Sequence, residues 1–296
     1  MGQTQTIAVL GTGIMGAPMA RNLARAGFAV RAWNRTREKA ASLHEAGIEV
    51  CDTPGGAVAG AACAITMVGD ADAVEAVMLG PGGALEQPPP GLLWLQCATV
   101  GVQGADHFAS VAQDRDVAFV DAPVLGTRKP AEDGTLTVLA SGAEQLRERC
   151  QPVFDAVAQK VLWVGAAGAG SRLKLVVNNW VLAVVTAVSE SLALAEGLGL
   201  DPTLFLSAIE GSQLDTPYAH LKGRAMINRE FPVSFPAAGA CKDAGLIVDA
   251  IRSRGVSGEV AEAVLQKFEH TVQEGHGDAD MAAAFLHSLG ALGNGS

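Results

Sequence analysis

The sequence predicts an α/β protein in which a domain with a mostly parallel sheet precedes a long helix and an all-α domain. The first half of the chain alternates short, continuous apolar runs with helix-like stretches. Continuous apolar strands separated by helices are typical of a parallel sheet that is covered on both faces. The strand pattern then stops near residue 164, and the rest of the chain has the pattern of helices.

The elements of the first half follow from these apolar runs and the segments between them. The predicted strands are residues 6–10, 29–33, 64–68, 92–97, 117–120, 136–140 and 161–164. The predicted helices are residues 15–26, 37–46, 72–78, 104–113 and 144–158. Strands that alternate with helices in this way form an α/β domain.

The second half is predicted to be helical throughout. Its first helix, residues 171–196, ends at glycines, and an Asp-Pro pair at 201–202 is typical of the next helix start. Further helices are predicted at residues 243–254, 259–273 and 280–289.

A short Gly/Ala-rich hinge at residues 165–170 separates the two patterns. The predicted domains are therefore residues 1–168 and 169–296. The most apolar segment, residues 173–194, is interrupted by Lys174 and other polar residues, and its uncharged run is shorter than the roughly 20 residues that a bilayer requires. A helix buried by protein explains it better, so no membrane partner is expected.

Composition excludes several classes of function. The 296 residues are 49% hydrophobic, which excludes general disorder, and the net charge of −10 gives no electrostatic basis for binding nucleic acid or anionic membranes. The five cysteines are scattered without CxxC spacing, as expected of reduced thiols in a cytoplasmic protein. The six histidines are isolated, so no metal site is expected.

A glycine-rich turn follows the first predicted strand. Gly11, Gly13 and Gly16, with Ile14 and Met15 between them, match the GxGxxG pattern. The pattern alone is weak evidence, because 35 glycines occur in the chain. Its position between a strand and a helix is what a turn presenting backbone N–H groups to a pyrophosphate requires. The first domain is therefore predicted to be a Rossmann-type dinucleotide-binding domain.

The end of the second strand indicates which dinucleotide binds. NAD-preferring sites place an acid there to accept from the ribose 2′-hydroxyl, whereas this chain has Asn34, Arg35 and Thr36, with no acid before Glu38. Arg35 could bind a 2′-phosphate through charged hydrogen bonds, and Thr36 could donate a hydroxyl. This pattern favours NADP(H); the alternative is a solvated arginine at a helix start.

Lys174 and Asn178 are four residues apart on the long helix and share one face. A desolvated lysine loses proton affinity and can act as an acid or base near neutral pH. From the residues alone, a helix-end lysine with its ammonium in solvent is the better interpretation.

Four segments, in order, resemble one family. They are LGTGIMGAPMARNLARAGF, DAPVLGTRKPAEDGTLTVLASG, GAGSRLKLVVNN and FPAAGACKDAGL. Together they resemble the β-hydroxyacid dehydrogenase family, which includes 3-hydroxyisobutyrate dehydrogenase. The stretch RKPAEDGTL is similar to the branch with glyoxylate and succinic semialdehyde reductases, which typically uses NADPH.

The resemblance implies a role for each matching residue. Lys174 matches the catalytic lysine and Asn178 its partner asparagine. The residues matching cofactor contacts are Lys242 beside the nicotinamide, Thr99 near its ribose, and Met67 and Val68 over the adenosine. The residues matching substrate contacts are Phe235, Gly126, Thr127 and Leu125, where Leu125 replaces the family's usual serine.

The resemblance thus implies an NADP(H)-dependent oxidoreductase that interconverts a small aldehyde or keto acid and its hydroxy acid, with Lys174 as the general acid or base. We expect a homodimer or tetramer, because the long helix is apolar on most faces. One alternative is an imine reductase, which shares the architecture, the Asn-Arg-Thr segment and the GHGD tail but usually lacks the lysine. The other is a non-catalytic NADP-binding scaffold.

Overall fold

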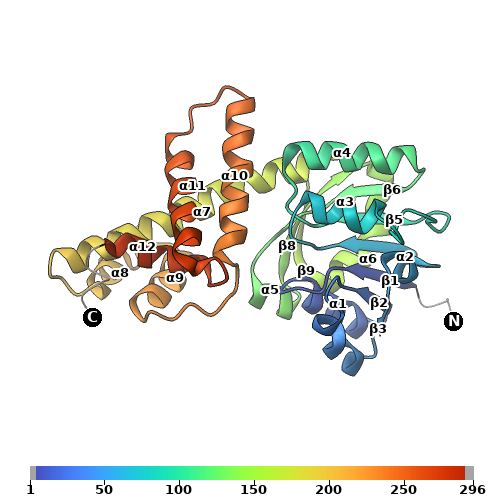
Figure 1. Ribbon diagram of the computed structural model, residues 1–296, viewed down its shortest axis with the longest axis horizontal. Helices are drawn as coiled ribbons and strands as arrows, with labels where there is room; N and C mark the ends of the chain where they lie inside the picture. Colours follow the sequence, from blue (N-terminus) through green and yellow to red (C-terminus); the bar gives the residue numbers. More distant parts are fainter. Residues whose placement is uncertain (1–4, 291–296) are drawn as a thin grey trace. The chain divides into compact units, whose positions relative to one another are not determined.

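The computed structural model describes residues 5–290, which fall into two compact units divided between Lys174 and Leu175. The boundary predicted between residues 168 and 169 lies six residues earlier (174 − 168 = 6). The outer ends of the two predicted domains, residues 1–4 and 291–296, lie outside the described residues. In Figure 1 the strands carry the blue, green and yellow-green colours of the first unit, whereas the second unit is helical.

The first unit contains one nine-stranded sheet among its described residues, with strand order β3-β2-β1-β4-β5-β6-β8-β7 and β9 paired to β8. Six neighbouring strands are parallel: β3 (Glu49–Val50), β2 (Ala29–Trp33), β1 (Thr6–Leu10), β4 (Cys63–Thr66), β5 (Leu93–Gln96) and β6 (Ala118–Asp121). The other three are β7 (Val124–Leu125), β8 (Leu136–Gly142) and β9 (Ala158–Trp163). The strand β8 runs antiparallel to β6 and β7, and parallel to β9.

Helices join these strands and cover the sheet. They are α1 (Gly16–Arg25), the 3₁₀ helix Arg37–Ala46, α2 (Pro54–Val58), α3 (Ala71–Leu79), α4 (Gly101–Asp114), α5 (Arg128–Asp133), the 3₁₀ turn Glu144–Leu146 and α6 (Arg147–Val157). Alternate residues of β1 belong to different cores: Ile7 packs with Leu23 of α1, whereas Leu10 packs with Phe108 of α4. The parallel sheet is therefore buried on both faces, which confirms the predicted fold class.

The second unit consists of helices. The long helix α7 (Ala169–Gly197) begins in the first unit and continues into the second. It is followed by α8 (Thr203–Ile209), α9 (Pro217–Ile227), α10 (Ala237–Ser253), α11 (Glu259–Thr271), a π-helical turn Val272–His276, a 3₁₀ turn Met281–Ala283 and α12 (Ala284–Leu289).

Several predicted boundaries were wrong, for identifiable reasons. The helix predicted at 144–158 ends at Val157, and the next strand begins at Ala158. In that strand Ala158 is followed by the exposed polar residues Gln159 and Lys160, so the apolar pattern placed its start too late. The helix predicted at 243–254 begins at Ala237, directly after Pro236, which puts Lys242 inside a helix. The helix α9 was not predicted, although Thr216 caps it by accepting from the Ala219 amide at 3.1 Å.

Among the described residues, α7 is the one helix whose length and hydropathy would suffice to cross a membrane. Its most apolar window has a mean hydropathy of 1.5. The core helix of a soluble domain passes the same test, so this property alone is weak evidence for a membrane span.

Candidate active site

The glycine-rich turn connects β1 to α1, and the absence of a side chain at its three glycines has different explanations. Gly11 has φ +100, and a Cβ there would collide with the Met67 carbonyl oxygen. A Cβ on Gly16 would collide with the Gly11 carbonyl. Gly13 is exposed, and a Cβ there would meet nothing of this chain within 4 Å. Packing within the protein therefore explains Gly11 and Gly16, whereas close approach of a ligand would explain Gly13.

Asn34 ties the end of β2 to this turn. Its Oδ1 accepts from the Thr12 amide at 3.0 Å, and its Nδ2 donates to the Thr36 carbonyl at 2.8 Å. Arg35 and Thr36 are exposed beside it, and the next arginine, Arg37, forms an ion pair with Asp52. The structure thus leaves two exposed donors where an NAD-preferring site would have a carboxylate.

Thr99 follows β5, and a buried network holds the loop that carries it. The Gln96 side chain accepts from the Ala98 amide at 2.9 Å and donates to the Ala98 carbonyl at 2.8 Å. Thr66 donates to Gln96 at 3.1 Å, and Trp94 donates to Thr66 at 3.0 Å. Because Thr66 ends β4 and Gln96 ends β5, this network fixes the carboxyl edge of the sheet, where α/β proteins bind their ligands.

Met67 and Val68 extend from β4 beside the glycine turn. The Met67 amide donates to the Leu10 carbonyl at 2.9 Å, and a Cβ on Gly11 would lie 2.7 Å from the Val68 side chain. Both residues are half-buried. Of the predicted cofactor residues, the structure thus brings Met67 and Val68 together with the glycine turn.

A fully buried carboxylate holds the first turn of α7. Asp121 accepts from the Ser171 amide at 2.8 Å, the Ser171 hydroxyl at 2.6 Å and the Ser141 hydroxyl at 3.1 Å. Ser141 in turn accepts from the Gly170 amide at 2.9 Å. Burial raises the pKa of Asp121, and the hydrogen bonds from Ser171 and Ser141 partly oppose that rise. This clamp, which sequence reasoning missed, fixes the helix end from which Lys174 projects.

Lys174 contacts the predicted substrate loop. Its Nζ donates to the Val124 carbonyl oxygen at 2.8 Å, and the lysine is half-buried. The loop turns sharply at Gly126, which has φ +116 and where a Cβ would lie 2.9 Å from Leu136. Leu125 pairs with Thr137 of β8 and is half-buried. The Lys174 ammonium thus has a partner in the predicted substrate loop, and its role as an acid or base stays a prediction.

In the second unit, a buried acid joins two of the predicted residues. Asp243 is 2% exposed and accepts from Asn178 Nδ2 at 2.7 Å. Lys242 Nζ lies 2.8 Å from the other carboxylate oxygen. Sequence reasoning missed Asp243, although an acid directly beside Lys242 and among apolar neighbours was a usable signal.

Phe235 precedes α10 and lies against its first turn. A Cβ on Gly239 would lie 2.8 Å from the Phe235 ring, and Lys242 follows three residues later on the same helix. The Phe235 amide donates to Asp280 at 3.2 Å, and the Lys222 ammonium binds the same carboxylate at 2.6 Å. Asp280 also caps the 3₁₀ turn that follows it, since it accepts from the Ala282 amide at 3.1 Å.

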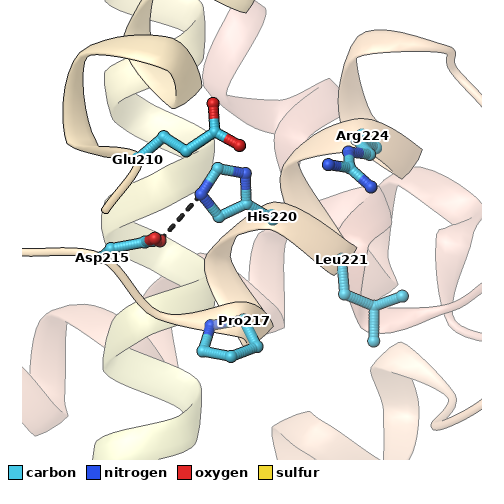
Figure 2. Close-up of a pocket in the computed structure, with 6 residues that line it drawn as sticks. All are labelled: Glu210, Asp215, Pro217, His220, Leu221 and Arg224. Atoms are coloured by element: carbon cyan, nitrogen blue, oxygen red, sulfur yellow. Dashed lines mark ion pairs between the residues drawn. The ribbon is translucent and has the colours of Figure 1, made fainter. Parts of the chain in front are cut away.

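A pocket in the second unit contains none of the predicted site residues. Figure 2 shows the residues that line it, which are Glu210, Asp215, Pro217, His220, Leu221 and Arg224. His220 Nε2 lies 2.8 Å from Asp215, whose pKa is lowered mainly by a hydrogen bond from the Gly211 amide. Among residues 5–290, no group of three or more His, Cys, Asp or Glu side chains could hold a metal ion.

Two family models match the sequence. The model described as the NAD binding domain of 6-phosphogluconate dehydrogenase matches residues 6–165. The model described as NAD-binding of NADP-dependent 3-hydroxyisobutyrate dehydrogenase matches residues 168–287. The chain belongs to the β-hydroxyacid dehydrogenase family. It is an NAD(P)-binding oxidoreductase that acts on CH–OH groups, which confirms the resemblance drawn from the four segments.

Individual relatives span the whole chain. Glyoxylate/succinic semialdehyde reductase 1 of Arabidopsis thaliana is 34% identical over 277 residues, covering 94% of this chain and 96% of that protein. A probable 3-hydroxyisobutyrate dehydrogenase of Mycobacterium bovis is 33% identical over 295 residues, covering 96% and 97%. The solved 3-hydroxyisobutyrate dehydrogenase of Mycobacterium tuberculosis, with L-serine, has a TM-score of 0.86 at 29% identity, covering 97% and 100%.

Proposed function

We propose that this member of the family is an NADPH-dependent reductase that interconverts a small aldehyde or keto acid of the semialdehyde type and its hydroxy acid. The observation that carries the proposal is the Lys174 ammonium, held 2.8 Å from the Val124 carbonyl beside the loop that matches the family's substrate loop. The name of the Arabidopsis relative supports the substrate class.

The first unit has residues that fit NADPH. The turn at Gly11, Gly13 and Gly16 would receive the pyrophosphate, and the open space above Gly13 fits such a ligand. Arg35 and Thr36 would bind the 2′-phosphate, because both are exposed and neither position at the end of β2 carries an acid. When bound, the nicotinamide supplies the hydride for reduction and accepts it in the reverse direction.

Lys174 is the proposed general acid and base of the reaction. In the direction of reduction its ammonium donates a proton to the oxygen of the developing alkoxide, and in the reverse direction the neutral amine takes the hydroxyl proton. The Val124 carbonyl accepts one ammonium hydrogen, which restricts the side chain to one orientation. The Asp121 clamp holds the helix end that bears the lysine.

The loop after β7 would receive the acid end of the substrate. Backbone groups of Gly126 and Thr127 are the proposed contacts, and Leu125 offers apolar surface where a serine would donate a hydrogen bond. Asn178 would position the reacting groups, and Phe235 and Lys242 would contact the substrate and the nicotinamide.

The two alternatives have less support. Similarity to the solved imine reductase of Pseudomonas sp. is limited to a TM-score of 0.64 at 20% identity, which supports a shared fold alone. A scaffold role would follow the cytokine-like nuclear factor N-PAC of Anopheles gambiae, which is 26% identical, but this chain covers 49% of that protein. A scaffold would have no use for a lysine held against a substrate loop.

We also propose that the chain forms at least a homodimer. Val176, Trp180 and Leu194 of α7, and Leu198 directly after its end, are each more than 60% exposed. The spacing of four and fourteen residues puts Val176, Trp180 and Leu194 on one stripe of a helix with 3.6 residues per turn. A second copy would cover this apolar stripe, and light scattering that gives a 30.3 kDa monomer at micromolar concentration would contradict it.

The test of the proposed function is an NADPH-oxidation assay over succinic semialdehyde, glyoxylate, methylmalonate semialdehyde, tartronate semialdehyde and a cyclic imine, repeated with NADH. We expect turnover with a semialdehyde acid and preference for NADPH. Turnover of the imine alone would establish the first alternative, and no turnover despite tight NADPH binding would establish the second.

A further inference from the structure

Asp243 connects two side chains to which the proposed reaction assigns roles. It accepts from Asn178 Nδ2 at 2.7 Å through Oδ2 and lies 2.8 Å from the Lys242 ammonium through Oδ1. Asp243 is 2% exposed and Asn178 is 5% exposed, so water does not compete for this hydrogen bond. The three residues form a chain of polar contacts within the second unit, from the half-buried Lys242 of α10 through Asp243 to Asn178 of α7.

An ionised carboxylate can only accept hydrogen bonds, whereas an asparagine amide has a donating and an accepting end of nearly the same shape. Asp243 therefore determines which end of the Asn178 amide faces it. The donating nitrogen is turned to Asp243, and the accepting oxygen is left for the other side. The Lys242 ammonium lies 2.8 Å from the other oxygen of the same carboxylate, so that oxygen also faces a donor.

We propose that Asp243 is a positioning residue that fixes the amide of Asn178 with its oxygen as the functional atom. Asn178 then acts as a hydrogen-bond acceptor, for the lysine ammonium or the substrate hydroxyl, and does not donate to the substrate carbonyl. This inference rests on the proposed function, because it gives Asn178 its role in the reaction of Lys174.

A purely structural role for Asp243 makes a different prediction. If Asp243 only balanced the charge of Lys242, its loss would have the same effect whether or not Asn178 is present. If it acts through Asn178, the effect of Asp243→Asn on kcat disappears in an Asn178→Ala background. A double-mutant cycle on kcat therefore separates the two roles. Asp249→Asn is the matched control, since it removes an exposed carboxylate from the same helix α10.

An exchange of the two side chains tests the donor and acceptor roles directly. Asn178→Asp alone puts two carboxylates together and should lower kcat by about 100-fold. The double variant Asn178→Asp, Asp243→Asn restores one donor facing one acceptor and still leaves an acceptor oxygen at position 178. We expect it to recover about tenfold in kcat over the single variant, with NADPH affinity within about twofold of wild type. The new carboxylate, four residues from Lys174 on one helix, should also shift the basic limb of the pH profile upward.

The outcomes are distinguishable. No recovery in the exchanged variant, or an Asp243→Asn effect that persists without Asn178, would overturn the role of Asp243 while leaving the proposed function in place. A Lys174→Ala enzyme with normal kcat would instead overturn the proposed function itself. Circular dichroism and thermal unfolding of each variant establish that the folded protein is being compared.

Discussion

The two units hold their functional side chains in place by different means. In the first unit the anchors are glycine turns and neutral donors. Asn34 and Gln96 fix loops through amide hydrogen bonds, and the buried Asp121 accepts from Ser141 and Ser171. Backbone amides and hydroxyls therefore supply most of the positioning there.

In the second unit the anchors are buried carboxylates paired with lysines. Asp280 binds Lys222, and the side chains of this pair are 4% and 5% exposed. Asp243 lies against Lys242. Each pair also fixes a residue of the predicted site, since Asp280 holds the Phe235 amide and Asp243 holds Asn178.

The pKa values of Asp121 and Asp280, which each accept several hydrogen bonds, reflect this difference. Burial dominates at Asp121 and raises its pKa. Burial also acts to raise the pKa of Asp280, but the Lys222 charge and the hydrogen bonds from Lys222, Ala282 and Ser234 together lower it. Replacing Asp121 or Asp280 by asparagine should therefore change the pH dependence of stability in opposite directions. Breaking an ion pair should lower the free energy of unfolding most in the second unit.

The largest expected effect on stability is in the second unit. Lys222→Met leaves Asp280 buried without its cation, and breaking a buried pair in this way typically lowers the free energy of unfolding by about 3–5 kcal/mol. Arg252→Met is the control, because its pair with Glu262 is 65% and 52% exposed and should contribute less than about 1 kcal/mol. Urea unfolding of both variants checks the difference; equal losses would remove the distinction between the two units.

A smaller effect is expected at the cofactor site of the first unit. Arg35→Ala should weaken NADPH binding by about 1.5–3 kcal/mol, the range for a hydrogen bond to a charged group, with little change for NADH. Arg37→Ala should have less effect, since Arg37 already pairs with Asp52. Fluorescence titration with both cofactors measures this. Equal weakening of NADPH and NADH would mean that Arg35 supports the fold and does not bind the 2′-phosphate.

The substrate loop should show a change of about tenfold. Leu125 offers a carboxylate no hydrogen bond, so Leu125→Ser should raise kcat/KM for small semialdehyde acids about tenfold, or about 1.4 kcal/mol. Wild type should be weak on glyoxylate and better on a substrate with an apolar portion. Assays of both enzymes on glyoxylate and succinic semialdehyde provide the comparison. If wild type already reduces glyoxylate well and Leu125→Ser leaves kcat/KM unchanged, the backbone donors of the loop are sufficient to bind the carboxylate.

The smallest effects are in the pH dependence of stability. Because folding lowers the pKa of Asp280, its contribution is present above its unfolded pKa of about 4 and is lost as the pH falls through the folded value. Because folding raises the pKa of Asp121, its contribution is present below about pH 4 and is lost as the pH rises through the folded value. As the pH falls, the free energy of unfolding of wild type should therefore decrease relative to that of Asp280→Asn. It should increase relative to that of Asp121→Asn. Denaturant unfolding between about pH 3 and 7 measures both slopes, and slopes of the same sign would contradict this contrast.

The sequence predicted the first unit well, because its signals are local. The parallel strands of four or five residues are mostly apolar, and Gly11, Gly13 and Gly16 lie within six residues of each other. The two-residue strands β3 and β7 and the short helices α2 and α5 were missed, since elements of two to six residues are too short to show a periodic pattern.

The anchors of the site could not be predicted in this way. Asp121 lies 50 residues before Ser171, and Asn178 lies 65 residues before Asp243, so no local spacing relates the partners. The interpretation of Lys174 as an acid or base came from the family resemblance, whereas the contact with Val124 that supports it requires the fold. The glycine motif therefore predicts its turn from neighbouring residues alone, whereas the contact of Lys174 depends on a residue 50 positions away in the sequence.

The turnover of Lys174→Ala with NADPH and the best semialdehyde acid is the decisive measurement for the proposed reaction. Loss of the general acid should lower kcat by about 10²–10⁴, while NADPH affinity stays close to that of wild type, because the proposed cofactor contacts are made by other residues. Asn178→Ala should cost less, since it orients groups and transfers no proton. Near-normal turnover of Lys174→Ala would contradict the assignment of the lysine, and with it the proposed reaction.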